Sequence, residues 1–414
     1  MMTNTYLPHV GGVANSVSTF TRGLQNKGHR VVVVAPEYTN YKHSERDVLR
    51  IPAIQHFNGS DFSVVLPVPV LLESHLENFK PDIVHSHHPF LIGSAAVRIS
   101  MKYNVPLVYT QHTMFEEYTH YVPVGLERLK PFVINLSTGY ANMSDEVIAP
   151  SESIAKILKK RGVSTPMEII PTGIDLDRFA KGDGETFRKS HKIPLDAFVA
   201  GHIGRLAPEK NLVFLSEAIA LFLKNEQKAH CMIVGYGSSE QKMNSLFVKN
   251  NLNHRVHFLG KLQGQELVDA YHAMDIFVFS SKSETQGLVL VEAMAAGVPV
   301  IALDAPGVRE VVQDGFNGYL LLKEDREDFV RALKKFCNIS DVVSKEFKVG
   351  VKKTAENFST NNCISKLLSV YEELRKENNI NREKDESVWR KSINQLKAEW
   401  ELFSNLTSAV GNTI

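Results

Sequence analysis

Short runs of apolar and β-branched residues recur along the chain, separated by longer stretches in which apolar residues have helical spacing. Four such runs lie early in the chain, at residues 30–35, 82–85, 107–110 and 146–149. Continuous apolar runs of this length are typical of strands that are buried on both faces of a parallel sheet. Their alternation with helical stretches predicts a doubly wound unit that ends near residue 175.

The same pattern then restarts, with further runs at residues 198–204, 229–235, 256–259, 275–279 and 298–302. Turn-forming residues at 171–177 separate the two sets and predict a hinge. We therefore predict an α/β protein with one doubly wound domain at residues 1–175, a second at residues 176–355, and a helical C-terminal segment at residues 356–414 that crosses back towards the first domain. Such domains bind ligands at the carboxyl ends of their strands, so a pair facing each other would share a cleft.

The first strand of the first domain is predicted to be short. Only residues 1–6 precede the region of the Gly11-Gly12 turn, and Val13 to Leu24 then have helical spacing. Two interpretations stay open: the sequence begins late, or the edge of the first sheet is short.

Composition restricts the class of protein. With 414 residues, of which 43% are apolar and 22% charged, the chain fits a two-domain globular protein. A formal net charge of +1 gives no global field that would attract nucleic acid. Three cysteines without metal-ligand spacing fit a reducing compartment, and no apolar stretch reaches the length of a membrane span. We expect a cytoplasmic protein, with contact to a membrane surface left open.

Two cations follow a predicted strand of the second unit. Arg205 and Lys210 lie five positions apart, after Gly204, on a loop that runs into a helix. A guanidinium can bind phosphate oxygens with two parallel hydrogen bonds, and an ammonium acts as a point charge. Because pre-placed cations stabilise charge that develops on a departing phosphate, this pair favours a diphosphate site over two solvated surface cations.

Two carboxylates form the second cluster. Glu284 lies on a loop, and Glu292 lies on the helix that residues 287–289 open. The members of this opening turn are Gly287, Leu288 and Val289. Free N–H groups at a helix start bind anions, and glycine lets a phosphate come close. The alternatives are a helix cap for Glu284 and a surface position for Glu292, but an unpaired carboxylate within the apolar run 288–296 would be costly.

Carboxylates that hold sugar hydroxyls, beside cations that hold a pyrophosphate, predict a pocket for a nucleotide-activated sugar. In the first unit, Gly11 and Gly12 allow a phosphate or acceptor to approach closely, and His112 follows the strand at residues 107–110, where doubly wound folds present ligand groups. A simple turn and a structural histidine are the alternatives for these positions.

Several other motifs favour ordinary roles. His85, His87 and His88 lack the carboxylate or cysteine partners of a metal site, and we expect them to form a polar lining. Asp175 and Asp177 lie in the hinge, where a turn or capping role is expected. The stretch 235–237 lacks the third glycine of a dinucleotide fingerprint, which argues against a nicotinamide enzyme.

With these motifs identified, the chain resembles family 4 of the retaining glycosyltransferases, which have the GT-B fold of two Rossmann-like domains facing across a cleft. The resemblance covers residues 2–375 and depends on the order of Gly11-Gly12-Val13, residues 82–87, His112-Thr113, Arg205 with Lys210, and Glu284 with Glu292. Residues 110–118 and 284–288 are most similar to diacylglycerol glucosyltransferases. Asn4 departs from the family, in which an aspartate often precedes the Gly-Gly loop.

The resemblance implies transfer of a hexose, glucose from UDP-glucose, with the anomeric configuration retained and without a metal or other cofactor. The implied acceptor is a diacylglycerol-type lipid at the cytoplasmic membrane face. Glu284, His112, Arg205 and Lys210 would be the catalytic set, with His112 near the sugar 6-hydroxyl and Glu292 at the ribose. Gly11, Gly12, Gly287, Leu288 and Val289 would complete the donor site. Transfer to a soluble sugar or polysaccharide, and nucleotide-sugar binding without turnover, are the alternatives.

The last thirty residues contain both tryptophans. An apolar stripe at steps of four and three predicts one helix face, formed by Trp389, Ile393, Leu396, Trp400 and Phe403. Basic residues lie off this stripe, as in helices that lie on membrane surfaces. Packing of the helix on the N-terminal domain or on another subunit is the alternative.

Overall fold

The chain forms two compact units. In this computed structural model the described residues are 1–9, 11–38, 47–54, 64–65, 72, 76–116, 129–338, 340–382, 401–406 and 408. Unit 1 contains residues 1–173 together with 361–414, and unit 2 contains residues 174–360. The chain therefore leaves unit 1 within the turn-rich stretch 171–177 and returns to it at the C-terminal end.

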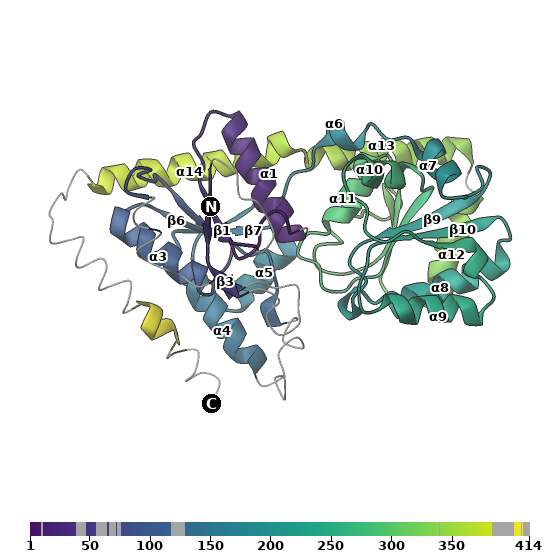
Figure 1. Cartoon of the computed structure of the whole chain (residues 1–414), viewed down its shortest axis with the longest axis horizontal. Helices are drawn as coiled ribbons and strands as arrows, with labels where there is room; N and C mark the ends of the chain where they lie inside the picture. Colours follow the sequence, from purple (N-terminus) through teal and green to yellow (C-terminus); the bar gives the residue numbers. More distant parts are fainter. Residues whose placement is uncertain are drawn as a thin grey trace. The chain divides into compact units, whose positions relative to one another are not determined.

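A parallel sheet forms the centre of unit 1 (Figure 1). Its strands, in spatial order, are β2 (Val48–Ile51), β1 (Val33–Pro36), β5 (Val84–Ser86), β6 (Leu107–Thr110), β7 (Glu146–Ala149) and β8 (Met167–Ile169). A separate antiparallel pair joins β3 (Ala53–Ile54) to β4 (Val64–Val65).

The first residues of the chain lie inside this sheet. Met2 forms parallel bridges with both Val34 of β1 and Ser86 of β5. Its amide donates to the carbonyl of His85 at 2.8 Å, and its own carbonyl accepts from His87 at 2.9 Å. The interpretation that a short edge of the sheet explains the abbreviated first strand is therefore wrong, since this strand joins β1 to β5.

Helices cover both faces of the first sheet. They are α1 (Gly12–Asn26), α3 (Ile92–Tyr103), α4 (Leu129–Asn142), α5 (Glu152–Lys160) and α14 (Thr360–Arg382). Apolar residues of α1 and α14 share one core cluster, and those of α3, α4 and α5 share another. The approach of α1 to α14 is close at Gly23, where a Cβ atom would lie 2.4 Å from Ile364 Cγ1.

Unit 2 is built on a six-stranded parallel sheet. The spatial order is β11 (Val256–Phe258), β10 (Ala229–Val234), β9 (Phe198–Ile203), β12 (Ile276–Phe279), β13 (Val300–Leu303) and β14 (Gly318–Leu321). The order reverses between β9 and β12, which is the switch point at which doubly wound sheets bind ligands. The prediction of two doubly wound, Rossmann-like units is confirmed by the topology of the two sheets.

Two helical layers cover the second sheet (Figure 1). One layer contains α8 (Leu212–Asn225), α9 (Glu240–Lys249) and α12 (Arg326–Cys337); the other contains α6 (Leu176–Phe179), α7 (Gly184–Ser190), α10 (Gly264–His272), α11 (Leu288–Ala295) and α13 (Asp341–Asn357). Short 3-10 turns lie at Pro208–Lys210 (η4) and Asn253–Arg255 (η5). Every residue of β12 and β13 is buried, and the loops at the carboxyl ends of the strands carry the charged residues Arg205, Lys210 and Glu284.

Candidate active site

The loop after β9 carries the two predicted cations. The Arg205 guanidinium forms an ion pair with Glu209 at 2.5 Å, and the carboxylate of Glu209 is nearly inaccessible to solvent. Ser280, at the end of β12, is buried, and its hydroxyl donates to the carbonyl of Lys210 at 2.9 Å and to that of Asn211 at 3.1 Å. The loop is therefore fixed to the neighbouring strand end, which restricts where Lys210 can reach.

Glu284 meets Lys210 directly. It lies in the segment between β12 and α11, and its Oε1 atom is 2.5 Å from Lys210 Nζ. The two side chains are 16% and 15% exposed, so water screens the pair only in part. The structure thus brings the predicted phosphate-binding and sugar-binding clusters into contact at the switch point of the sheet. The N-cap of α11 is Gly287, so a capping role does not explain Glu284.

Two glycines shape the entrance to α11. Gly287 has a φ of +70° and directly precedes Leu288 and Val289, the first residues of the helix. Amides in a first helical turn have no intrahelical acceptor and can bind an anion. Gly307 has a φ of +75°, and a Cβ atom there would lie 2.8 Å from the amide of Gln286 and the carbonyl of Glu284. Both glycines are therefore required by the path of the backbone.

Glu292 has a partner that the sequence did not reveal. Tyr271, a buried residue of α10, donates its hydroxyl hydrogen to Glu292 Oε2 at 2.7 Å. Burial raises the pKa of the Glu292 carboxyl, while the hydrogen bond from Tyr271 and the charge of Arg178 act in the opposite direction. A solvated surface position is wrong for Glu292, which is half-buried and oriented by Tyr271.

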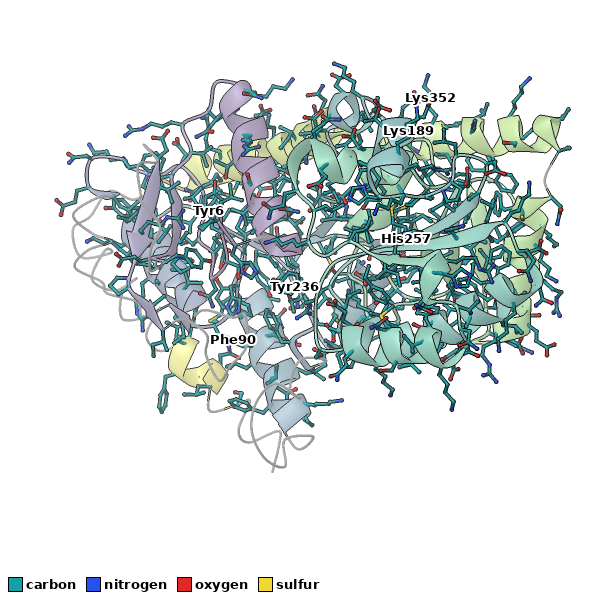
Figure 2. All side chains as sticks on the ribbon, turned by 45° about the vertical axis from the view of Figure 1, so that its right-hand side comes forward. Tyr6, Phe90, Lys189, Tyr236, His257 and Lys352 are labelled. Carbon is teal, nitrogen blue, oxygen red and sulfur yellow. The ribbon has the colours of Figure 1, made fainter. Side chains whose placement is uncertain are left out.

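A cavity of about 470 Å³ opens at the carboxyl ends of β10 and β11. Its lining residues are Gly237, Ser238, Glu240, Gln241, Asn244 and Phe258. Tyr236, labelled in Figure 2, precedes this set, is 47% exposed, and has Lys261 Nζ 5.9 Å from its ring centroid. The cavity has room for a planar ring and for polar groups beside it.

In unit 1, His112 belongs to a group of stacked imidazoles, of which those of His85 and His87 are buried. Its Nε2 atom is 2.9 Å from His87 Nδ1, and the two rings are stacked with centroids 5.1 Å apart. His87 in turn stacks on His85, which contacts the hydroxyls of Thr110 at 2.7 Å and Tyr371 at 2.5 Å. Burial lowers the pKa of His112 to about 3, so its ring is neutral at pH 7.

The neighbouring histidine, His88, contacts Asn4 instead: His88 Nδ1 lies 3.1 Å from Asn4 Nδ2. Burial lowers the pKa of His85, His87 and His88, so these rings are neutral, and their role as a polar lining stays a prediction. Among the described residues, no group of three or more His, Cys, Asp or Glu side chains is arranged to hold a metal ion.

Gly11 and Gly12 lie at the start of α1. Gly11 caps the helix with an extended backbone, φ −173°, which any residue can adopt. A Cβ atom on Gly12 would meet no described atom within 4 Å. The fold of unit 1 therefore gives no packing reason for glycine at position 12.

Other predicted features have clear outcomes. The capping role of Asp175 is confirmed, because its Oδ1 atom accepts from the Arg178 amide at 3.1 Å at the start of α6.

The C-terminal segment is helical at residues 401–406. Asn405 donates to the carbonyl of Leu136 on α4 at 3.1 Å, while Phe403 stays 59% exposed. Trp389 and Trp400 lie outside the described residues. No helix within the described ranges is long and apolar enough to cross a bilayer.

Sequence reasoning missed three residues of this site: Tyr271, Ser280 and Glu209. Glu209 could have been found, because it lies between Arg205 and Lys210. Tyr271 and Ser280 carried no local signal, since their partners come from distant parts of the chain.

Each half of the chain matches a model of a known protein family. Residues 10–178 match Glycosyltransferase Family 4, and residues 183–357 match Glycosyl transferases group 1. The alpha-monoglucosyldiacylglycerol synthase of Acholeplasma laidlawii is 29% identical over 395 residues, which cover 92% of this chain and 98% of the relative. A GDP-mannose-dependent alpha-mannosyltransferase of Mycobacterium tuberculosis is 28% identical over 78% of this chain and 82% of its own.

The fold is also that of a solved structure. HepE of Anabaena, crystallised in complex with UDP-glucose, superposes with a TM-score of 0.71 at 20% identity, covering 89% of this chain and 98% of HepE.

Proposed function

We propose that this chain, which has the GT-B fold and whose two halves match Glycosyltransferase Family 4 and Glycosyl transferases group 1, transfers glucose from UDP-glucose to a diacylglycerol-type lipid, retaining the anomeric configuration. The observation that carries the proposal is the contact between Lys210 and Glu284 at the switch point of the second sheet. A sugar diphosphate offers each of these groups a better partner, since phosphate oxygens can replace the carboxylate and sugar hydroxyls can replace the ammonium.

In the proposed reaction, the bond between the anomeric carbon and the phosphate oxygen breaks as the acceptor hydroxyl attacks from the same face. The new bond joins the anomeric carbon to the acceptor oxygen, and the acceptor proton passes to an oxygen of the departing UDP. Arg205 and Lys210 stabilise the negative charge that grows on the β-phosphate. The amides of Leu288 and Val289 add donors to the same diphosphate.

The remaining residues orient the donor. Glu284 accepts hydrogen bonds from sugar hydroxyls, and Glu292, held by Tyr271, accepts from the ribose. We propose that the nucleoside base occupies the cavity beside Phe258. A neutral imidazole can take part in a hydrogen bond with a hydroxyl group, which suits the role that the resemblance implies for His112, and the same resemblance implies the roles of Gly11 and Gly12. Because Arg205 and Lys210 are proposed to neutralise the diphosphate, we expect transfer to continue when a chelator removes divalent metal ions.

Support for a lipid acceptor comes from the name of the Acholeplasma relative, which carries both a glucosyl group and diacylglycerol. The exposed apolar side chains of Phe403 and Leu406, next to α4, are compatible with a membrane surface at the cytoplasmic face. A second function, mannosyl transfer, is favoured by the names of the mycobacterial relative and of similar relatives from Corynebacterium glutamicum and Mycolicibacterium smegmatis.

One experiment tests these assignments. Purified protein is incubated with UDP-glucose, UDP-galactose or GDP-mannose, each with diacylglycerol vesicles or with a soluble sugar, and products are identified by mass spectrometry and by NMR of the anomeric proton. We expect an α-glucosyl lipid from UDP-glucose and vesicles. A product formed only with soluble sugars would favour the alternative acceptor class. Neither transfer nor hydrolysis of any donor would indicate a nucleotide-sugar-binding protein.

A further inference from the structure

A buried histidine lies beneath the loop that carries Arg205. His202 is the second-last residue of β9 and is 1% exposed. Its ring is stacked with Phe277 and Phe279 of β12, at centroid distances of 6.2 and 6.1 Å. The neighbouring strand positions, Gly201 and Ile203, carry no polar side chain.

The two ring nitrogens of His202 have different surroundings. Nδ1 lies 3.0 Å from the carbonyl oxygen of Val278, which can only accept, so Nδ1 carries the hydrogen. Burial lowers the pKa of His202 to about 4, so at pH 7 the ring is neutral and Nε2 carries a lone pair. Among the described residues, this buried Nε2 atom has no hydrogen-bond partner.

The unpartnered nitrogen lies next to Gly204, the residue that precedes Arg205 in the loop after β9. A Cβ atom on Gly204 would lie 3.5 Å from His202 Nε2 and would meet nothing within 4 Å except the ring of His202. The charges of Lys210 and Glu284 both act on the ring, one lowering and the other raising its pKa. With glycine at position 204, the ring of His202 is therefore the only described group next to that Cβ position, close to the pair that is proposed to hold the donor.

We propose that His202 Nε2 is a hydrogen-bond acceptor of the donor-binding site and receives a hydroxyl group of the nucleotide sugar. An acceptor requires a partner that brings a hydrogen, which an ionised phosphate oxygen does not. Buried polar atoms are otherwise paired in native proteins, and an acceptor left empty at a ligand site is filled when the ligand binds. This inference rests on the proposed function, and the hydroxyl comes either from the transferred sugar or from the ribose.

Two substitutions of His202 distinguish the role of Nδ1 from that of Nε2. In His202→Asn the side-chain amide can still donate to Val278, but nothing reaches the position of Nε2. In His202→Gln the longer side chain can place its amide oxygen near that position. Binding of UDP and of UDP-glucose to the full chain is measured by calorimetry, and thermal unfolding without ligand checks that each variant is folded.

We expect His202→Asn to bind UDP-glucose about tenfold more weakly and His202→Gln to remain within about threefold of the wild type, as for one lost or replaced hydrogen bond. An equal loss for UDP identifies the ribose hydroxyl, and a loss confined to UDP-glucose identifies a sugar hydroxyl. Unchanged affinity of His202→Asn for both ligands would overturn the inference, whereas a wild type that binds neither ligand overturns the proposed function itself.

A measurement on the wild type covers the case in which a variant does not fold. The ¹⁵N resonance of His202 Nε2 is expected to move when UDP-glucose is added, because accepting a hydrogen bond changes the shielding of a lone-pair nitrogen. A resonance that stays in place would show that His202 serves only the packing of β9 on β12.

Discussion

The ammonium nitrogen of Lys210 lies 2.5 Å from the carboxylate of Glu284, although the two residues are 74 positions apart in the sequence. Each group compensates the charge of the other in a place where solvent has little access. A partly buried charge that loses its partner is costly. The pair therefore keeps in place two groups that are proposed to bind the donor, and a donor that binds there would supply replacement partners for both.

Lys210→Ala and Glu284→Ala should each lower the rate of glucosyl transfer by about 10²- to 10³-fold, because each removes a group that acts on the departing diphosphate or on the sugar. The measurement is turnover of UDP-glucose with lipid vesicles, with circular dichroism to confirm folding. Lys189→Ala is the matched control: Lys189 pairs with Glu185 at 2.6 Å on the exposed surface of α7 (Figure 2), and its loss should leave turnover unchanged. Rates near wild type for both site variants would refute the assignment.

Glu292→Gln should stabilise the protein at neutral and alkaline pH. Burial raises the pKa of Glu292, so the folded state holds this proton more tightly than the unfolded state. The contribution of Glu292 to stability therefore falls as the pH rises from the pKa of this carboxyl in the unfolded state to its pKa in the folded state. Above that range the charge of Glu292 destabilises the folded protein. Glutamine is neutral and can still accept from Tyr271.

The check on Glu292→Gln is thermal unfolding of both proteins across a pH series. The melting temperature of the variant should exceed that of the wild type by a few degrees at pH 8, and the difference should shrink as the wild-type carboxyl becomes protonated in acid. Affinity for UDP should fall, because glutamine is a weaker acceptor for the ribose. A melting difference that grows in acid would contradict the role of burial.

Gly307→Ala should impair both stability and transfer. Alanine at a φ of +75° costs about 1–2 kcal/mol, and its Cβ atom would also press on the backbone of Glu284 and Gln286 at 2.8 Å. Gly297→Ala is the control, since Gly297 has a φ of +82° but open space around its Cβ position. Denaturant unfolding should show a larger loss for Gly307→Ala, and only this variant should slow transfer. Equal losses of stability in the two variants, with the transfer rate unchanged in both, would show that Gly307 does not position Glu284.

Much of this architecture follows from the sequence because buried parallel strands are continuous apolar runs. The runs at residues 107–110 and 146–149 coincide with β6 and β7, and Lys210 and Glu284, whose charges predicted a shared site, each follow a strand of one sheet. The carboxyl ends of parallel strands meet at one edge, so residues far apart in sequence become neighbours without any further information.

The contacts that orient these groups could not be predicted in the same way. Tyr271 reaches Glu292 because α10 and α11 lie in the same layer with particular faces together, and His87 reaches His112 because two strand ends lie side by side. Such contacts depend on the rotation and register of whole elements, to which many weak packing interactions contribute. The place of Met2 between β1 and β5 was missed for a related reason, since two or three residues are too few to show a strand pattern.

Gly12→Ala should weaken ligand binding without lowering the stability of the fold. Alanine is favoured over glycine in a helix by about 0.5–1 kcal/mol, and the added Cβ atom would meet no described atom within 4 Å, so the variant should be as stable as the wild type or slightly more stable. Affinity for UDP-glucose, measured by calorimetry, should nevertheless fall, because the methyl group occupies the space proposed for the donor or acceptor. Gly23→Ala gives the opposite result: its Cβ atom would meet Ile364 at 2.4 Å, so stability should fall through packing of α1 on α14. If Gly12→Ala binds and transfers like the wild type, the glycine pair serves only the turn before α1.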